Sequence, residues 1–302
     1  MEDKIKEIEK LKKRKRAIIL AHNYQRPEVQ DIADFTGDSL ELARKTVGLR
    51  DFDVILFCGV RFMAETAKIL SPGKTVLLPE SDAGCPLADM AEAYDVEEMR
   101  RKYPGAWVVS YVNTSAEVKA LSDVCCTSAN ADRVVKNIPA KQVIFLPDRN
   151  LCSYVKNRAG EKDIICWEGY CYVHGKFTQE DVRKARKLYP EGEIIVHPEC
   201  SPGVQKLADH IYSTSGMLKR ARESEAKTFI IGTEEGLLHR MKKENPGKTF
   251  YSLGAGRTCY NMKKITLSSV KESLEKGIYE VEVEHETSVK ARKALERMIE
   301  YA

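Results

Sequence analysis

A weak threefold repeat of about 86 to 89 residues is the feature that most constrains the fold of this 302-residue chain. When the chain is aligned with itself at offsets of about 89 and then 86 residues, apolar runs and single polar residues recur in one order. This common order and phase indicate three copies of one supersecondary unit. The matching positions are residues 17–20, 106–109 and 193–196, residues 54–56, 143–145 and 228–230, and Asp34, Asp123 and Asp209.

Three cysteines, Cys85, Cys171 and Cys259, stand at equivalent points of this repeat, 86 and 88 residues apart. Each follows a short apolar run, at residues 76–78, 164–166 and 249–251. Equivalent positions in a repeat predict one thiolate from each unit, and we expect the three to converge. Three thiolates at one point suit a metal site that keeps a coordination position open for chemistry.

Short apolar runs alternate with longer amphipathic stretches, which indicates βαβ units, parallel sheets and an α/β fold. The predicted order within a unit is strand, loop, helix, strand, helix, strand and a cysteine-bearing loop. The repeats are expected at residues 1–87, with an N-terminal helix included, 88–173 and 174–260, followed by a helical extension at residues 261–302 that packs on the body. Helices are expected to begin near Gln30, Ser39, Glu117, Ser128 and Thr214, where polar or acidic side chains can cap backbone N–H groups.

The composition excludes several classes of protein. The net charge is only +4 although 31% of residues are charged, which argues against a dedicated nucleic-acid binder. No apolar stretch approaches the roughly 20 residues that a membrane-spanning helix needs. The N-terminus lacks the apolar region of a signal peptide, so a cytoplasmic location is expected. In that compartment the nine cysteines should be thiols or metal ligands, not disulfides.

Polar side chains follow the first predicted strand of each unit. They include His22, Asn23 and Tyr24 in the first unit, Tyr111 and Asn113 in the second, and His197, Glu199 and Cys200 in the third. Ligands of parallel α/β sheets bind beyond the carboxyl ends of the strands, so we expect these groups to line one site. Histidine at two of the three strand ends favours acid–base chemistry or carboxylate binding near neutral pH.

Hydroxyl groups form a second layer in repeat phase. Ser39, Ser128 and Thr214 occupy equivalent positions, and Ser213 precedes the last of them. Each precedes or begins a predicted helix, where a hydroxyl and free N–H groups bind phosphate or carboxylate. The simpler interpretation, that each hydroxyl only caps its helix, holds for any single one. Three such helix ends facing one cavity would suit a small polyanionic substrate.

The cysteine spacing leaves two kinds of metal open. Zinc sites are usually built from local CxxC pairs, and this sequence has none. Three well-separated cysteines instead fit a 4Fe–4S cluster in which one iron has no protein ligand. Such an iron is a Lewis acid that binds a hydroxyl or carboxylate and assists dehydration.

The combined motifs resemble quinolinate synthase, the NadA family, in its short form. The matching segments are AHNYQ at 21–25, GDS at 37–39, SYVNT at 110–114, GYCYVH at 169–174, VHPEC at 196–200 and STS at 213–215. The resemblance covers nearly the whole chain. It implies three similar three-layer αβα domains in a pseudo-threefold arrangement around one 4Fe–4S cluster, with one open iron. Cys85, Cys171 and Cys259 would be the cluster ligands.

The resemblance also implies the reaction and its participants. The family is a transferase of NAD biosynthesis that condenses iminoaspartate with dihydroxyacetone phosphate to quinolinate, losing phosphate and two waters. Tyr24 and Glu199 match positions of proton transfer, His197 and His174 are further catalytic candidates, and a partner would be the aspartate oxidase or dehydrogenase that supplies iminoaspartate. The positions that match substrate binding are His22, Ser39, Tyr111, Asn113, Ser128, His197, Glu199 and Thr214, with Ser213 beside them.

Three rival hypotheses remain at this level. A non-catalytic iron–sulfur protein would favour four cysteine ligands and few converging His, Glu and Tyr groups. Another 4Fe–4S-dependent hydro-lyase acting on dicarboxylates would share the open iron. A zinc-stabilised nucleic-acid module is disfavoured by the near-neutral charge.

Overall fold

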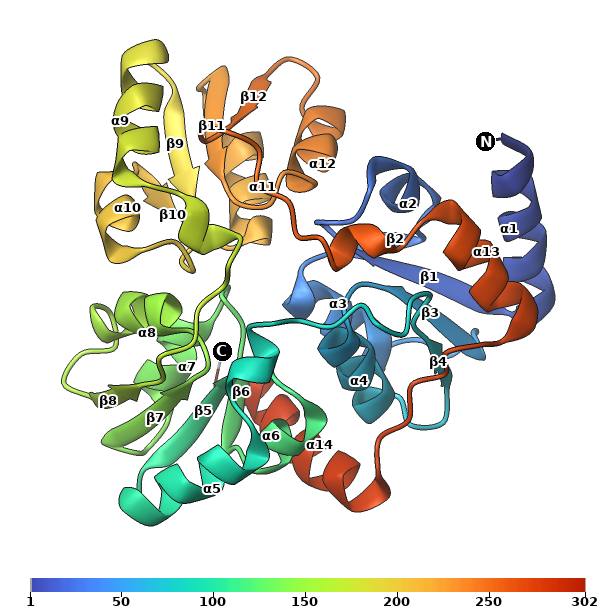
Figure 1. Cartoon of the computed structure of the whole chain (residues 1–302), viewed down its shortest axis with the longest axis horizontal. Helices are drawn as coiled ribbons and strands as arrows, with labels where there is room; N and C mark the ends of the chain where they lie inside the picture. The colour runs from blue at the N-terminus through green and yellow to red at the C-terminus, as the bar shows by residue number, and fades with distance from the viewer. Residues whose placement is uncertain (1, 302) are drawn as a thin grey trace.

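The computed structural model describes residues 2–301 and contains three units of one design, arranged around a common centre (Figure 1). The first unit alternates strands and helices up to its cysteine loop. Its elements are β1 (Ala17–His22), α2 (Pro27–Ile32), β2 (Phe35–Gly37), α3 (Ser39–Val47), β3 (Val54–Cys58), α4 (Arg61–Leu70) and β4 (Thr75–Leu77).

A helix, α1 (Glu2–Lys15), precedes the first unit, and the second and third units repeat the whole order, each after its own preceding helix. The second comprises α5 (Ala93–Lys102), β5 (Trp107–Tyr111), α6 (Ala116–Ala120), β6 (Val124–Cys126), α7 (Ala131–Asn137), β7 (Gln142–Leu146), α8 (Arg149–Lys156) and β8 (Asp163–Cys166). The third comprises α9 (Gln179–Leu188), β9 (Glu193–Val196), α10 (Pro202–Leu207), β10 (His210–Ile211), α11 (Thr214–Glu223), β11 (Thr228–Gly232), α12 (Leu237–Glu244) and β12 (Thr249–Ser252).

Each unit builds one four-stranded parallel sheet, and the three sheets share one strand order. The orders are β2-β1-β3-β4, β6-β5-β7-β8 and β10-β9-β11-β12. The α/β class and the repeat are therefore confirmed. The second strand of each unit was not predicted, because two or three residues at a sheet edge are too short to show a period in the sequence.

The three aligned aspartates make the same contacts in every unit. Asp34, Asp123 and Asp209 each accept a hydrogen bond from a backbone N–H of the first strand of their unit, at 2.8, 2.7 and 2.8 Å. Each also pairs with a cation from the preceding helix, namely Lys12 of α1 (Glu2–Lys15), Arg100 of α5 and Arg186 of α9. The aspartate thus joins helix, strand and loop at one point of the unit.

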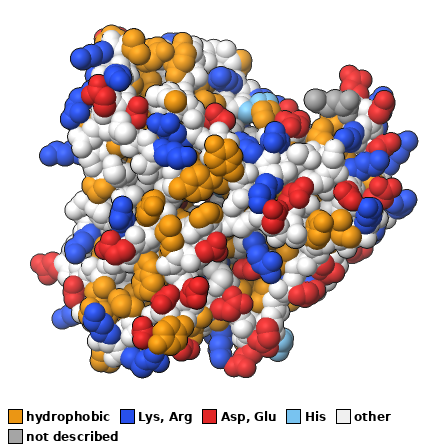
Figure 2. All heavy atoms as spheres, viewed as in Figure 1, with side chains coloured by type: hydrophobic (Ala, Val, Ile, Leu, Met, Phe, Trp, Pro, Cys, Tyr) orange, Lys and Arg blue, Asp and Glu red, His pale blue; other side chains and the backbone are white. Residues whose placement is uncertain are grey.

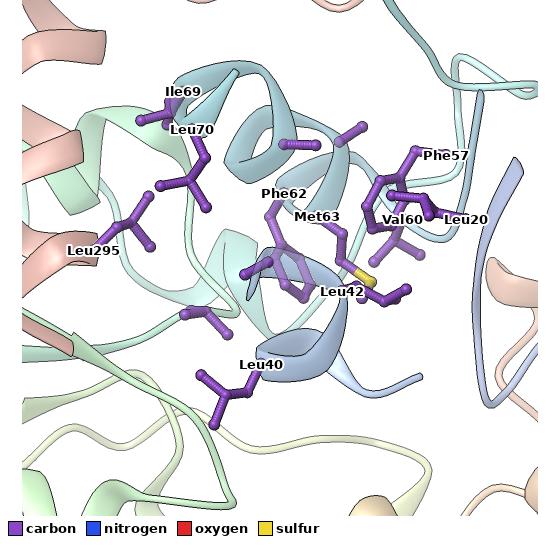
Figure 3. Close-up of a cluster of buried hydrophobic side chains, with 14 of the residues drawn as sticks. Leu20, Leu40, Leu42, Phe57, Val60, Phe62, Met63, Ile69, Leu70 and Leu295 are labelled. Atoms are coloured by element: carbon purple, nitrogen blue, oxygen red, sulfur yellow. The ribbon is translucent and has the colours of Figure 1, made fainter. Parts of the chain in front are cut away.

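The sheets are covered by helices whose apolar faces form the core. In the first unit, Leu42 of α3 and Phe62 and Met63 of α4 lie in one cluster with Phe57 of β3 (Figure 3). Leu295 from the C-terminal helix joins this cluster near Leu70 (Figure 3). Acidic and basic side chains are interspersed over the visible surface (Figure 2).

The C-terminal extension contains two helices that dock separately. The helix α13 (Leu267–Lys276) packs on α1, whereas α14 (His285–Glu300) packs on α6, β6 and α4. The last helix therefore lies mainly on the second unit, and it also contacts α4 of the first unit. Its buried residues are Ala291, Ala294, Leu295 and Met298.

The expectation that every cysteine is a thiol or a metal ligand was wrong. Cys152 of α8 and Cys166 of β8 form a disulfide, with Cα atoms 5.8 Å apart. The helix α8 packs directly on the strand β8, which brings two cysteines 14 residues apart within bonding reach.

None of the helices described over residues 2–301 is long and apolar enough to cross a membrane.

Candidate active site

The three repeat cysteines occupy one structural position. Each follows the last strand of its unit and precedes a 3₁₀ turn that begins three residues later, at Ala88–Met90, His174–Lys176 and Met262–Lys264. The carbonyl oxygens of Cys85, Cys171 and Cys259 each accept from the backbone N–H four residues on, at 3.2, 2.9 and 3.2 Å. The predicted equivalence of the three cysteines therefore extends to their backbone hydrogen bonds.

The same turns direct backbone N–H groups at the sulfurs. Burial raises the pKa of all three thiols, that of Cys85 to about 12. The N–H groups of Ala88, His174 and Met262, each three residues after a cysteine, act to lower the pKa. Hydrogen bonds of this kind favour the thiolate, which is the form that binds metal.

All three cysteines line one cavity at the centre of the molecule. The remaining walls come from the carboxyl ends of strands and from the loops behind them, in all three units. The sequence-predicted residues that line it are His22, Tyr24, Ser39, Tyr111, Asn113, Ser128, His174, His197, Glu199 and Thr214. The chain thus brings together groups that lie up to 237 positions apart in the sequence, from His22 to Cys259.

Three candidates from the sequence lie outside this lining, and one of them is the fully buried Asn23. Ser213 is the N-cap of α11, where its hydroxyl accepts from the N–H of Gly216 at 3.3 Å. Cys200 is fully buried, and its thiol contacts the carbonyl of Gly232 at 3.5 Å. A further difference concerns Ser128, since α7 begins at Ala131 and the serine lies in the turn before it.

Two cavity histidines are held in the same tautomer. The backbone N–H of Tyr24 donates to Nδ1 of His22 at 3.2 Å, and that of Glu199 donates to Nδ1 of His197 at 3.3 Å. Because Nδ1 accepts, the proton of each neutral ring lies on Nε2. Nε2 of His197 meets the hydroxyl of Ser128 at 3.2 Å.

Burial keeps these rings neutral. Burial, assisted by the charge of Lys263, lowers the pKa of His22 to about 3. Burial together with the neighbouring His174 lowers the pKa of His197 to about 3. Both side chains are therefore neutral Nε2–H donors near pH 7, suited to binding carboxylate or carbonyl oxygen.

A continuous chain of hydrogen bonds ends at Glu199. Its Oε1 accepts from Oη of Tyr111 at 2.6 Å, and its Oε2 lies 2.9 Å from Nδ1 of His174. Nε2 of His174 lies 2.8 Å from Oγ1 of Thr233, which in turn lies 2.6 Å from Oη of Tyr24. An ionised carboxylate only accepts, so the O–H of Tyr111 and the Nδ1–H of His174 both donate to Glu199.

The groups of this hydrogen-bond network also shift one another's pKa values. Burial acts to raise the pKa of Glu199, but the neighbouring His174 and His197 and the bonds from His174 and Tyr111 hold it below its ordinary value. Burial and the charge of Glu199 raise the pKa of Tyr24 and Tyr111 well above the usual range. The arrangement therefore pairs one ionised base with two protonated phenols.

Sequence reasoning missed Thr233 and Glu234, which follow β11. Glu234 lines the cavity, is fully buried and pairs with Lys263 at 3.0 Å. The signal that found His197 at the end of the first strand of this unit applies equally to the end of its neighbour β11. The rule that polar residues after a strand line the site was applied only to the first strand of each unit.

Two further polar residues of the cavity are Asn113, whose buried amide oxygen Oδ1 has no hydrogen-bond partner among residues 2–301, and Thr214. Thr214 accepts at 3.0 Å from Nδ2 of Asn23, whose Oδ1 accepts from Arg240 at 2.9 Å. An orphaned buried amide oxygen indicates that a ligand completes its bonding.

The donor set fits a sulfur-bound metal group. Cys85, Cys171 and Cys259 line one cavity, and the described residues supply no fourth cysteine to its wall. The ligand atoms of Cys171, His174 and Glu199 lie within 4.8 Å of one another, but His174 and Glu199 already bond each other. Three thiols from three loops are therefore the available ligands for an iron–sulfur group.

Comparison with known proteins gives one consistent result. The family model described as quinolinate synthetase A protein matches residues 6–300. A quinolinate synthase of Thermodesulfovibrio yellowstonii is 55% identical over 298 residues, covering 98% of this chain and 97% of the relative. Quinolinate synthases of Thermococcus kodakarensis and Methanoregula boonei are 54% and 53% identical, covering 98% and 97% of this chain and 97% and 96% of the relatives.

Proposed function

The chain belongs to the quinolinate synthetase A family of enzymes, and we propose that its central cavity condenses iminoaspartate with dihydroxyacetone phosphate to quinolinate. Phosphate and two waters leave in the course of the reaction, which serves NAD biosynthesis. The observation that carries the proposal is the meeting of three cysteines, two neutral histidines and one ionised glutamate in a single cavity. We also propose that the enzyme acts in the cytoplasm.

The cofactor of this family is an iron–sulfur group, and we propose one 4Fe–4S cluster held by Cys85, Cys171 and Cys259. The backbone N–H groups aimed at the three sulfurs support this ligand set. When bound, such a cluster supplies a Lewis-acidic iron with an open position, which assists loss of a hydroxyl group.

The substrate carboxylates and phosphate need fixed donors. His22 and His197 offer Nε2–H groups, and Ser39, Ser128 and Thr214 offer hydroxyls from the three units. The orphaned Oδ1 of Asn113 suits an N–H or O–H of the substrate. Neutral donors in a buried site bind anions without burying a further charge of their own.

Glu199 is the proposed base for the proton removals. It is 3% exposed, is held ionised and is oriented on both oxygens by Tyr111 and His174. Tyr24 and Tyr111 remain protonated, so either phenol can return a proton to a developing oxyanion or leaving hydroxyl. The buried cavity limits access of water to the hydrolysable imine.

The decisive experiment supplies the anaerobically reconstituted protein with dihydroxyacetone phosphate and iminoaspartate generated from aspartate by an oxidase or dehydrogenase. Quinolinate and inorganic phosphate should appear in equal amounts. A hydro-lyase acting on dicarboxylates would instead dehydrate a hydroxydicarboxylate and release no phosphate. Failure to form quinolinate with a complete cluster present would refute the proposal.

A further inference from the structure

One backbone hydrogen bond holds each cysteine loop against the sheet of its unit. The N–H of Arg61, Arg149 and Glu235, behind the third strand of each unit, donates to the carbonyl two residues before the cysteine, at 2.8, 2.8 and 3.0 Å. The residue that precedes each donor differs between the units. It is Val60 in the first unit, Asp148 in the second and Glu234 in the third.

The two carboxyl groups at this position have the same forked arrangement. Oδ1 of Asp148 accepts from the N–H of Leu151 at 2.7 Å, and Oδ2 accepts from the N–H of Cys171 at 3.1 Å. Oε2 of Glu234 accepts from the N–H of Gly236 at 2.7 Å, and Oε1 accepts from the N–H of Cys259 at 3.1 Å. One oxygen of each carboxyl group thus accepts from a backbone N–H two or three residues further on, and the other accepts from the backbone N–H of the cysteine.

Both side chains are fully buried, which calls for a reason because burying an acid is unfavourable. Burial raises the pKa of both carboxyl groups. The N–H donors, and at Glu234 also Lys263, oppose that rise.

The cysteine loop of the second unit also lies close against the segment that follows β7. A Cβ added at Gly169, two residues before Cys171, would lie 2.4 Å from the carbonyl oxygen of Pro147.

The three cysteine loops are bonded to one another as well. Nδ2 of Asn261, two residues after Cys259, donates to the carbonyl of Gly84, next to Cys85, at 2.9 Å. The N–H of Tyr260 donates to Oη of Tyr172 at 2.9 Å. The first loop, whose unit has Val60 in place of the buried acid, is thus also bonded to the loop that Glu234 anchors.

We propose that Asp148 and Glu234 are positioning residues for the metal site, each fixing an iron-binding cysteine through its backbone N–H. This inference rests on the proposed cluster and deepens it. The proposed reaction uses neither of these two buried acids. Their role is to hold the thiol ligands in place before and after the cluster binds.

The test replaces each acid by its amide, Asp148→Asn and Glu234→Gln. An amide has one acceptor oxygen, so it can serve one N–H but not both. Asparagine caps helices as well as aspartate does, and α8 should keep its N-cap. The bond to the cysteine N–H is then the one lost. Asp163→Asn and Glu223→Gln are matched controls, because both side chains lie at the surface of the same units.

Two quantities are measured on anaerobically reconstituted protein: the rate of iron release to a chelator and the electron paramagnetic resonance spectrum of the reduced cluster. We expect iron release about tenfold faster in each amide variant than in its control, with an altered spectrum. The thermal unfolding midpoint of the Asp148→Asn apo-protein should match that of its control, whereas Glu234→Gln also breaks the ion pair with Lys263 and should unfold at a lower temperature.

Two results would overturn the inference. One is iron release within twofold of the controls with an unchanged spectrum. The other is faster release in Asp148→Asn that is matched by an equal loss of apo-protein stability, since that would be a general structural effect. If the unsubstituted protein itself assembles no iron and sulfide, the proposed cluster fails first. If it assembles them and the variants behave as controls, only the positioning role fails.

Discussion

At the scale of single residues, hydrogen bonds gather two phenols, an imidazole and a threonine around one carboxylate. Tyr111 and His174 bond Glu199 directly, while Tyr24 reaches it through Thr233 and His174. Such a network is valuable only when every member has its partner, because an unpaired buried polar group is costly. Each member can therefore be tested by a substitution that removes one bond and leaves the volume unchanged.

Glu199→Gln should fold and retain iron and sulfide but lose quinolinate formation by at least about a hundredfold, since a general base contributes roughly 10²–10⁴ to the rate. Glutamine keeps the size of the side chain but cannot take up a proton. The measurements are turnover and metal content of the same preparation. Near-native turnover would remove Glu199 from the proton transfers.

Thr233→Val should reduce kcat about ten- to a hundredfold, because the free energy lost when a buried partner disappears is roughly 1–3 kcal/mol. Valine has nearly the same shape, but Oη of Tyr24 and Nε2 of His174 lose their common partner. Thr233→Ser keeps the hydroxyl and should restore most of the rate. Thr228→Val, at the other end of β11, serves as the control. Equal rates for the valine and serine variants would exclude a role for the hydroxyl.

The lowered pKa values of His22 and His197 predict how stability depends on pH. Both rings titrate near 3 when folded and near 6.5 when unfolded, so the unfolded chain binds more protons between these values. The free energy of unfolding should therefore fall as pH decreases from 6.5 toward 3, by up to about 1.4 kcal/mol per pH unit for each histidine. Well above pH 6.5, where the unfolded rings are also neutral, these groups contribute no slope.

Denaturant unfolding of the apo-protein at pH 7, 5.5 and 4.5 measures this slope. His22→Asn removes one of the two titrating rings and should make the slope shallower in this window. An unchanged slope would show that His22 is protonated in the folded state and is not the neutral donor assigned above.

At the scale of elements, the repeated aspartate explains why helix, strand and loop of a unit keep one geometry. Asp123 accepts from the N–H of Val108 and pairs with Arg100 of α5, both within 2.8 Å. Asp34 and Asp209 do the same in the other two units. These contacts explain why an acid recurs at this point of each repeat.

Asp123→Ala should destabilise the apo-protein by about 1–3 kcal/mol, because it removes a buried backbone contact and an ion pair together. Thermal unfolding measures the effect, expected as a fall of about 2–4 °C per kcal/mol. Asp132→Ala is the control, because that aspartate bonds only the adjacent N–H of Arg133 at the surface. A midpoint equal to that of the control would contradict the structural role of the repeated aspartate.

Long strands and helices are predicted from the sequence better than short ones. Strands and helices such as β3 and α4 have apolar patterns long enough to read, whereas β10 has two residues and leaves no pattern. The cavity groups at the first strand ends were predicted because the repeat aligned them. Thr233 and the Cys152–Cys166 disulfide depend on which elements become neighbours, and the repeat carries no such information.

At the scale of the whole molecule, the three units meet through their strand ends. Tyr111 of the second unit bonds Glu199 of the third, and Asn23 of the first bonds Thr214 of the third. The cysteines add one thiol from each unit to the same cavity. A cluster bound there would link all three units, so its loss should lower the stability of the assembled chain.

This arrangement makes the last prediction a test of the threefold design. Cys85→Ala, Cys171→Ala and Cys259→Ala should each lose the cluster, because no other cysteine lines the cavity wall built from the described residues. Cys152→Ala should retain it, since that sulfur lies in a disulfide between α8 and β8 and not at the cavity. Iron and sulfide analysis after anaerobic purification distinguishes the two groups. A complete cluster that survives the loss of any one of the three cysteines would mean that the units do not contribute equally, and the convergence of one thiolate from each repeat would have to be abandoned.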